Sequence, residues 1–168
     1  MKLFDNVLSD KLLHEIRGQI NKAVPEHKWT SSVAWPHDLT FGIVGTSLQC
    51  LIEDEVKEKI LDQIQHLLPV CEKYHMQYYL WLPTSGISVH DDYGKVFGAT
   101  IYLNEQWYFD QGGIFIYKKS ATENDPEWTA LLPKHNTMIL NDIKEQHMVT
   151  PVSADSPDVR TTIQIWGL

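Results

Sequence analysis

The feature that most limits how this chain can fold is a series of short β-type runs that begins near residue 74. Turn-forming strings such as PTSG at 83–86 and QGG at 111–113 separate these runs. Many short strands at this spacing are typical of a β-sandwich or a β-barrel. The predicted strands span residues 77–82, 87–90, 96–103, 113–118, 137–140, 147–150 and 160–166.

Two amphipathic segments precede the strands and predict helices. Ser9 is a suitable N-cap for the first helix, and the second helix is predicted over residues 53–68. Each helix has one apolar face and should therefore pack against another layer. In the first helix, that face consists of Leu12, Leu13, Ile16 and Ile20.

The order of helices first and strands later predicts an α+β fold, in which two N-terminal helices buttress a double-sheet barrel. The chain has 168 residues, and we expect a single domain over residues 1–168. Its helical part is predicted at about 1–72 and its barrel core at about 73–168. Residues 29–35 are predicted to add an edge strand.

Composition argues against several classes of partner. The formal net charge of −8 disfavours nucleic acid and anionic membrane surfaces, because both attract clustered Lys and Arg. The first residues lack the apolar core of a signal peptide, and no apolar stretch approaches the roughly 18 residues of a transmembrane helix. Cys50 and Cys71 are therefore predicted to be reduced thiols in a cytoplasmic protein.

Three side chains form a candidate metal site. A predicted strand ends at His90, and because side chains alternate along a strand, positions 90 and 92 face the same side. His147 lies in another β-type run, 57 residues further along. Two imidazoles with the Asp92 carboxylate form the ligand set of non-haem Fe(II) oxygenases, which leaves positions open for substrate and oxygen. The H-x-D pattern alone is weak evidence, because a chain with 8 histidines and 22 acidic residues easily contains one by chance.

Arginine usage adds a second observation. The chain has two arginines, and Arg17 is expected to face solvent on the first helix. Arg160 opens an otherwise uncharged final run, on the same side as Thr162 and Gln164. A guanidinium that points into a barrel is expected to bind an anion, because its geometry matches a carboxylate bidentately. A salt bridge to a protein carboxylate is the alternative.

The order and spacing of further motifs resemble the catalytic core of the Fe(II)/2-oxoglutarate-dependent oxygenases. The similarity is to the prolyl 4-hydroxylase branch, and particularly to the oxygen-sensing prolyl hydroxylases. It covers most of the chain, including an opening string FDNVLS at 4–9. The matching strings are H-x-D at 90–92, IYLNEQW at 101–107, QGG at 111–113, LPK at 132–134, MIL at 138–140, H-x-V-x-P at 147–151 and R-x-x-I-x-I-W at 160–166.

The resemblance implies a double-stranded β-helix (jelly-roll) core and a role for each matching residue. His90, Asp92 and His147 match the catalytic iron ligands. Arg160 matches the basic residue that binds the C5 carboxylate of 2-oxoglutarate, and Tyr102 matches a tyrosine whose hydroxyl joins that contact. The implied cofactors are Fe(II), 2-oxoglutarate as co-substrate and O2, with ascorbate as a reductant.

Two further cofactor contacts are expected on weaker grounds. Thr162 shares the side of Arg160, and an upstream tyrosine of the family is matched only by Tyr79 or Trp81. Arg160 follows His147 by 13 residues, more than in the oxygen-sensing enzymes, which predicts an inserted turn at 153–157.

For the substrate, the resemblance favours a prolyl residue in a peptide or protein. Trp107, Tyr108 and Phe109 either grip a proline ring or pack the loop before Gly112, and Trp166 is a further candidate contact. Residues 35–46 form either a lid or an ordinary connection.

Three alternatives differ in substrate or class. The same site suits a hydroxylase of a free amino acid or another small molecule. Nucleic-acid demethylation of the AlkB type is disfavoured by the negative charge and by the absence of an arginine after Arg160. A non-enzymatic jelly-roll binding protein requires the metal-site residues and Arg160 to coincide by accident.

Overall fold

The structure is a computed structural model that describes residues 1–168 except 25, 27, 32–44, 120–126 and 143. Within the described residues, the chain order of the elements is β1 (Lys2–Asp5), α1 (Asp10–Ala23), β2 (Thr30–Ser31), β3 (Ser47–Leu51), α2 (Asp54–Ile64), η2 (Gln65–Leu67), β4 (Tyr74–Trp81), β5 (Ile87–His90), β6 (Phe97–Tyr102), η3 (Phe109–Gln111), β7 (Phe115–Lys118), β8 (Trp128–Leu131), β9 (Thr137–Asp142), β10 (His147–Val149) and β11 (Arg160–Gly167).

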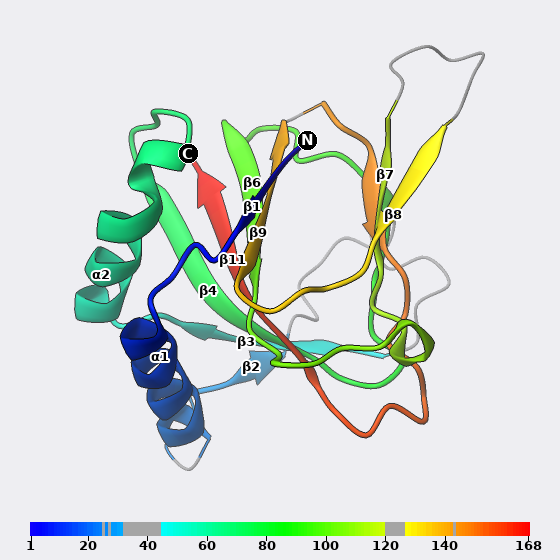
Figure 1. Ribbon diagram of the computed structural model, residues 1–168, viewed down its shortest axis with the longest axis horizontal. Coiled ribbons are helices and arrows are strands. Elements are labelled where there is room, and N and C mark those ends of the chain that lie inside the picture. Colours follow the sequence, from blue (N-terminus) through cyan, green and yellow to red (C-terminus); the bar gives the residue numbers. More distant parts are fainter. Residues whose placement is uncertain (25, 27, 32–44, 120–126, 143) are drawn as a thin grey trace.

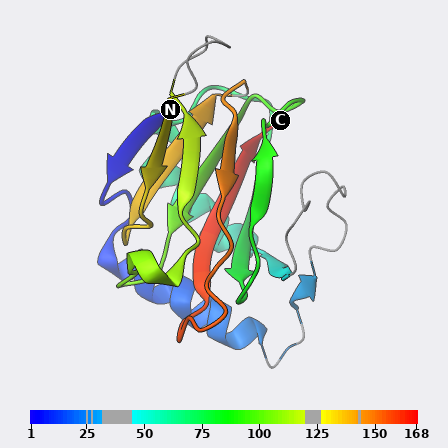
Figure 2. The same cartoon turned by 90° about the vertical axis from the view of Figure 1, so that its right-hand side faces the viewer.

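The strands form two antiparallel sheets, and both helices lie on the outer side of the larger one (Figure 1). The larger sheet has the order β1-β9-β6-β11-β4-β3-β2, and the smaller has the order β5-β10-β7-β8. Figure 2, which views the molecule from the smaller sheet, shows these four strands side by side in front of β11. The predicted α+β jelly-roll fold is thereby confirmed.

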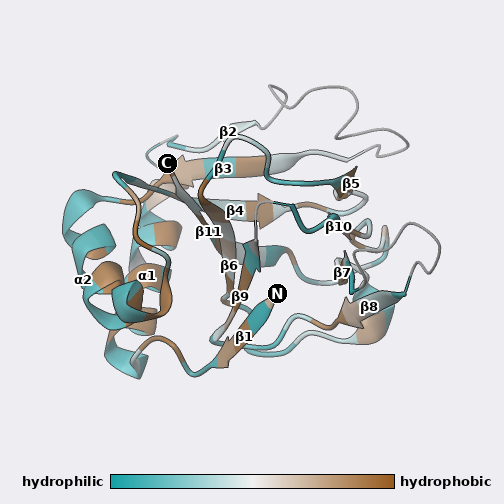
Figure 3. Ribbon diagram, turned by 90° about the horizontal axis from the view of Figure 1, so that it is seen from above, coloured by the Kyte–Doolittle hydropathy of each residue, from teal (hydrophilic) through white to brown (hydrophobic). Residues whose placement is uncertain are grey.

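Alternate side chains of the larger sheet pack on opposite faces, as the geometry of a strand requires. Its outer face packs against apolar residues of α1 and α2, whose outward sides are hydrophilic (Figure 3). The sheet contributes to this core Met76, Tyr78, Phe97, Ala99, Ile101, Met138, Leu140, Ile163 and Ile165. Its inner face forms a smaller cluster with the second sheet, which includes Tyr79, Trp81, Tyr102, Ile139, Phe115 and Val149.

Both helices begin where the sequence predicts. The Ser9 hydroxyl accepts a hydrogen bond from the Leu12 backbone N–H at 3.4 Å and so caps α1. No side chain caps α2, but Asp54 and Glu55 lie in its first turn, where negative charge interacts favourably with the helix dipole. The short helix η2 continues α2 to Leu67, which accounts for most of the segment predicted over 53–68.

The structure adds strands that the sequence pattern does not predict. The seven predicted strands correspond to β4, β5, β6, β7, β9, β10 and β11, whereas β1, β3 and β8 are additional. The first 72 residues therefore contribute strands as well as helices. Each additional strand pairs with a predicted one, β1 with β9, β3 with β4 and β8 with β7. These segments become strands through tertiary pairing, which a short local sequence pattern does not encode.

Two predicted features include residues that the structure does not describe. Strand β2 lies inside the region 29–35 that was expected to form an edge strand, but residues 32–35 lie outside the described part of the chain. Most of the expected lid or connection at 35–46 also lies outside it. Among the described residues, no helix combines the length and the apolar character that a membrane crossing requires.

Candidate metal centre

The two histidines of the predicted site lie directly opposite each other on neighbouring strands. His90 ends β5, His147 begins β10, and the two are paired in the antiparallel register with ring centroids 4.2 Å apart. Asp92 follows in the turn after β5. One candidate ligand atom from each of the three residues lies within 4.8 Å of the other two. The structure therefore brings the predicted His-Asp-His triad together, and the triad fits an iron site.

Backbone carbonyls orient both imidazoles. Nδ1 of His90 lies 2.7 Å from the Ser88 carbonyl oxygen, and Nδ1 of His147 lies 2.8 Å from that of Glu145. A carbonyl only accepts, so each Nδ1 carries the hydrogen and each Nε2 presents its lone pair. Burial, followed by the charge of His147, lowers the pKa of His90. The neutral ring that a metal requires is thereby favoured.

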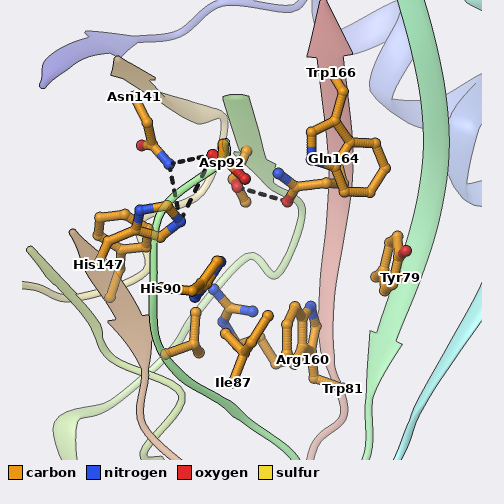
Figure 4. Close-up of a pocket in the computed structure, with 13 residues that line it drawn as sticks. Tyr79, Trp81, Ile87, His90, Asp92, Asn141, His147, Arg160, Gln164 and Trp166 are labelled. Atoms are coloured by element: carbon orange, nitrogen blue, oxygen red, sulfur yellow. Dashed lines mark hydrogen bonds and ion pairs between the residues drawn. The ribbon is translucent and has the colours of Figure 1, made fainter. Parts of the chain in front are cut away.

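Arg160 lies at the far end of the same cavity from the Asp92 carboxylate (Figure 4). The cavity is open to solvent on one side, and together with its mouth it spans about 480 Å³ that protein atoms do not fill. It lies between the two sheets and is lined by Tyr79, Trp81, Ile87, His90, Asp92, Thr100, Phe115, Asn141, His147, Val149, Arg160, Gln164 and Trp166.

The Arg160 side chain is a buried cation without a counter-charge in the described part of the chain. It is 1 % exposed, and its Nε and Nη1 atoms form no hydrogen bond there. The guanidinium carbon lies 4.9 Å from the ring centroid of Trp81 and 5.0 Å from that of Tyr102. Burial lowers the pKa of Arg160, and the nearby Tyr102 opposes that shift. Such a group favours an anionic ligand, because isolated buried charge is costly.

The Tyr102 hydroxyl is likewise a buried polar group without a hydrogen-bond partner among the described residues. Its pKa is raised by burial, while Arg160 opposes the shift. A buried hydroxyl and a buried guanidinium side by side provide donors for one carboxylate.

Gly113 provides the room for Arg160. A β-carbon on Gly113 would lie 2.6 Å from Cδ of Arg160, and the backbone φ of +61° is one that other residues rarely adopt. The second glycine of the QGG string is therefore explained by the approach of the arginine stem to the backbone.

The other residues predicted to contact the cofactor, Tyr79, Trp81 and Thr162, do not all line the cavity. Tyr79 and Trp81 both line the cavity, but the Tyr79 hydroxyl donates to Gln49 Oε1 at 2.9 Å. Thr162 is fully buried, and its hydroxyl accepts from the Trp81 indole at 3.1 Å. Thr162 thus orients Trp81 and does not itself line the cavity.

Of the aromatic residues expected to contact the substrate, one lines the cavity and the others do not. Trp166 lines the cavity, where its ring meets Tyr79 edge-on at 6.1 Å. Trp107 and Tyr108 are not among the cavity-lining residues. Trp107 is 6 % exposed and donates to the Gly112 carbonyl at 2.8 Å, so it packs the loop. Tyr108 is 59 % exposed.

Several cavity residues are absent from the set predicted by sequence. Asn141 is one, because the predicted strand ended at residue 140, whereas β9 continues to Asp142. Thr100 and Gln164 are joined by a 2.7 Å hydrogen bond in which the threonine hydroxyl donates. The alternation along the strand places Gln164 on the side of Arg160 but gives it no role in the site.

No protein-family model and no curated protein matches this sequence. Solved structures do match its fold. A prolyl-4-hydroxylase from Pseudomonas putida superposes with a TM-score of 0.72 at 15% identity, over 99% of this chain and 91% of that one. A prolyl hydroxylase from Trichoplax adhaerens, solved with a peptide fragment of the hypoxia-inducible factor, gives 0.71 at 13%, over 99% and 82%.

An enzyme with a different reaction, an epimerase, matches the fold almost equally well. The epimerase SnoN from nogalamycin biosynthesis, which depends on non-haem iron and α-ketoglutarate, gives a TM-score of 0.71 at 10% identity, over 99% of this chain and 76% of that one. The similar structures therefore share a fold and differ in their reactions. This chain has the fold of the Fe(II)/2-oxoglutarate oxygenases, with a His-Asp-His triad that fits an iron site.

Proposed function

We propose that the protein is an Fe(II)- and 2-oxoglutarate-dependent dioxygenase that hydroxylates prolyl residues in a peptide or protein. The observation that carries the oxygenase assignment is the pairing of two features in one cavity. One feature is the triad of ligand atoms, and the other is the buried, uncompensated guanidinium of Arg160. A transition-metal ligand set and an anion site are what a metal-bound dicarboxylic acid requires.

In this proposal, His90, Asp92 and His147 would hold Fe(II), while Arg160 and Tyr102 would bind the distal carboxylate of 2-oxoglutarate. The donor set fits both groups, because the imidazole Nε2 atoms present lone pairs and the guanidinium and hydroxyl present unused hydrogens. Bound iron, 2-oxoglutarate and O2 together supply the oxidising chemistry that replaces a C–H bond by C–OH, with succinate and CO2 as the other products.

The residues of the chain itself bind, orient and exclude water. Trp81, held by Thr162, covers one side of the Arg160 guanidinium and shields it from solvent. Tyr79 and Trp166 continue this aromatic wall, and in this proposal Trp166 contacts the substrate. Low solvent access strengthens the interaction of Arg160 with an anion.

The prolyl substrate is supported by fold similarity to two prolyl hydroxylases, one of them solved with a peptide. A second candidate is a hydroxylase or related oxygenase of a small molecule, which the equally similar structure of SnoN favours. The net charge of −8 supports neither a nucleic-acid substrate nor an anionic surface.

The test begins with anaerobic titration of the purified protein with Fe(II), with and without 2-oxoglutarate. The proposal expects a charge-transfer absorption band that needs both ligands. Succinate release is then measured against proline-containing peptides, free proline and other amino acids. Release with peptides supports the prolyl assignment, and release with free amino acids only supports the second candidate. Absence of metal binding contradicts both.

A further inference from the structure

Two residues that face each other across neighbouring strands both contact the Asp92 carboxylate. Gly98 of β6 is paired with Asn141 of β9 in the antiparallel register of the larger sheet. Asp92 itself belongs to the turn after β5, on the smaller sheet. Of the pair, Asn141 lines the cavity and lies beside the Asp92 carboxylate (Figure 4).

Gly98 provides the space for the carboxylate. A β-carbon at this position would overlap Oδ2 of Asp92 and would lie 3.0 Å from its Cγ. The backbone of Gly98 is in ordinary strand conformation, so the glycine is not required by a positive φ. Glycine weakens the interior of a strand, and its use there is typical of places where another group approaches closely. Here the group that approaches is Asp92.

Asn141 provides the hydrogen bonds. Its side-chain Nδ2 lies 3.4 Å from Asp92 Oδ2 and 3.3 Å from His147 Nε2, while those two acceptor atoms lie 3.7 Å apart. Asn141 is 3 % exposed, and its Oδ1 has no hydrogen-bond partner among the described residues. The amide thus presents its nitrogen, and not its oxygen, to both ligand atoms.

The chemistry of the two acceptors explains why a donor is needed. His147 uses Nδ1 as the donor to Glu145, so Nε2 presents a lone pair toward the ionised oxygen of Asp92. Two such atoms 3.7 Å apart repel each other unless a donor or a cation lies between or beside them. In the ligand-free protein the amide supplies a donor to both. When a metal takes the Nε2 lone pair of His147, the hydrogen bond to Asp92 is the one that can remain, and hydrogen bonds to a ligating carboxylate fix its direction.

We infer that Gly98 and Asn141 position Asp92 against His147 and thereby set the affinity of the triad for a divalent first-row transition metal. Asn141 acts as a positioning residue and not as a ligand. This inference rests on the proposed function, because it takes the triad to be a metal site.

The decisive variant is Asn141→Leu, which keeps the side-chain size and removes both donors. Its affinity for Co(II) and Mn(II), measured anaerobically by calorimetry, is expected to fall about 10- to 100-fold, the usual effect of losing a hydrogen-bond partner of a metal ligand. The Co(II) d–d absorption bands should shift as Asp92 moves. Asn104→Leu is the matched control, because its amide is bonded to the backbone at Val159 and Thr161 and it does not line the cavity, and it should bind metal like the wild type.

Gly98→Ala provides an independent variant, because the added methyl displaces Asp92. Metal affinity should fall by a similar factor, while Gly18→Ala, at an exposed helical position where nothing lies within 4 Å of an added β-carbon, should have no effect. Circular dichroism and the melting temperature without metal report folding. If Gly98→Ala does not fold, the Asn141→Leu result decides.

The outcomes separate this inference from the proposed function. Unchanged or tighter metal binding in Asn141→Leu, with normal binding in the wild type, overturns the positioning role alone. No metal binding by the wild type overturns the proposed function. At saturating metal, the affinity of Asn141→Leu for 2-oxoglutarate should equal that of the wild type, and a loss there would mean that the change disturbs the whole cavity.

Discussion

His90 and His147 are cross-strand partners whose Nε2 atoms are both left as acceptors by the same kind of contact, an Nδ1–H bond to a backbone carbonyl two residues earlier in the chain. The smaller sheet therefore fixes two of the three triad residues before any metal is bound.

Replacing His147 should remove the metal site without unfolding the protein. His147→Ala is expected to weaken Co(II) or Fe(II) binding by more than about 100-fold, since a ligand matters more than its hydrogen-bond partners. Anaerobic metal titration measures the change. His66→Ala, at an exposed position on η2, is the control. Equal metal affinities in the two variants would contradict the assignment of the triad.

Arg160 should affect 2-oxoglutarate much more than the metal. Loss of a buried charged hydrogen-bond partner typically costs about 2–5 kcal/mol, so Arg160→Met should weaken 2-oxoglutarate binding by about 30-fold or more. Metal affinity should stay within about threefold of the wild type. Arg17→Ala removes a half-exposed arginine that pairs with Glu105 and serves as the control. A parallel loss of metal and 2-oxoglutarate in Arg160→Met would argue against a separate carboxylate site.

The same substitution should stabilise the ligand-free protein. Replacing even a buried ion pair by apolar side chains of similar size is often neutral or stabilising by about 1–4 kcal/mol, and replacing a buried charge without a counter-charge should gain at least as much. A gain of about 1 kcal/mol corresponds to a rise in Tm of roughly 2–4 °C in a chain of this size. Thermal unfolding of Arg160→Met without ligands measures the effect. A lower Tm would mean that the cation–π contacts with Trp81 and Tyr102 outweigh the burial of charge.

Binding of 2-oxoglutarate should stabilise the wild type and not Arg160→Met. A ligand at 100 times its Kd stabilises the folded state by about 2.7 kcal/mol. The metal-loaded wild type should therefore gain several degrees in Tm with excess 2-oxoglutarate under anaerobic conditions, and Arg160→Met should gain almost nothing. An equal rise in both proteins would place the dicarboxylate elsewhere.

Trp166 should affect the substrate without affecting the co-substrate. In the proposed function its ring contacts the substrate, so Trp166→Ala is expected to raise KM for the peptide about tenfold, roughly the worth of one aromatic contact. The Kd for 2-oxoglutarate should change little. Trp128→Ala, on the edge strand β8 and outside the cavity, is the control. An unchanged KM in Trp166→Ala would remove this residue from the substrate contact.

Sequence patterns predict the chemical residues of this cavity better than its supporting ones. The period of two along strands places His90 with Asp92, and Arg160 with Gln164, on common faces, and a single inward arginine is conspicuous in a chain that has two. Gly98 and Asn141 could not be predicted in this way. Their contacts with Asp92 depend on how the two sheets approach each other, which is a tertiary relationship.

The loop aromatics show the same limit. Trp107 and Tyr108 are adjacent to the QGG string and look equally suited to a ligand. Only the packed structure separates the buried Trp107, whose indole closes the loop on Gly112, from the exposed Tyr108. The additional strands β1, β3 and β8 could not be predicted for the same reason, because each forms by pairing with a strand that is separated from it in the sequence.

Alternate side chains of strand β11 face two different parts of the molecule. Arg160, Gln164 and Trp166 face the cavity, whereas Ile163 and Ile165 pack against the helical layer on the other face. Changes at the first set should alter what the cavity binds, and changes at the second should alter the stability of the fold. Specificity can therefore diverge, in evolution or in the laboratory, with little loss of thermal resistance, which suits a fold whose structural neighbours range from prolyl hydroxylases to an epimerase of nogalamycin biosynthesis.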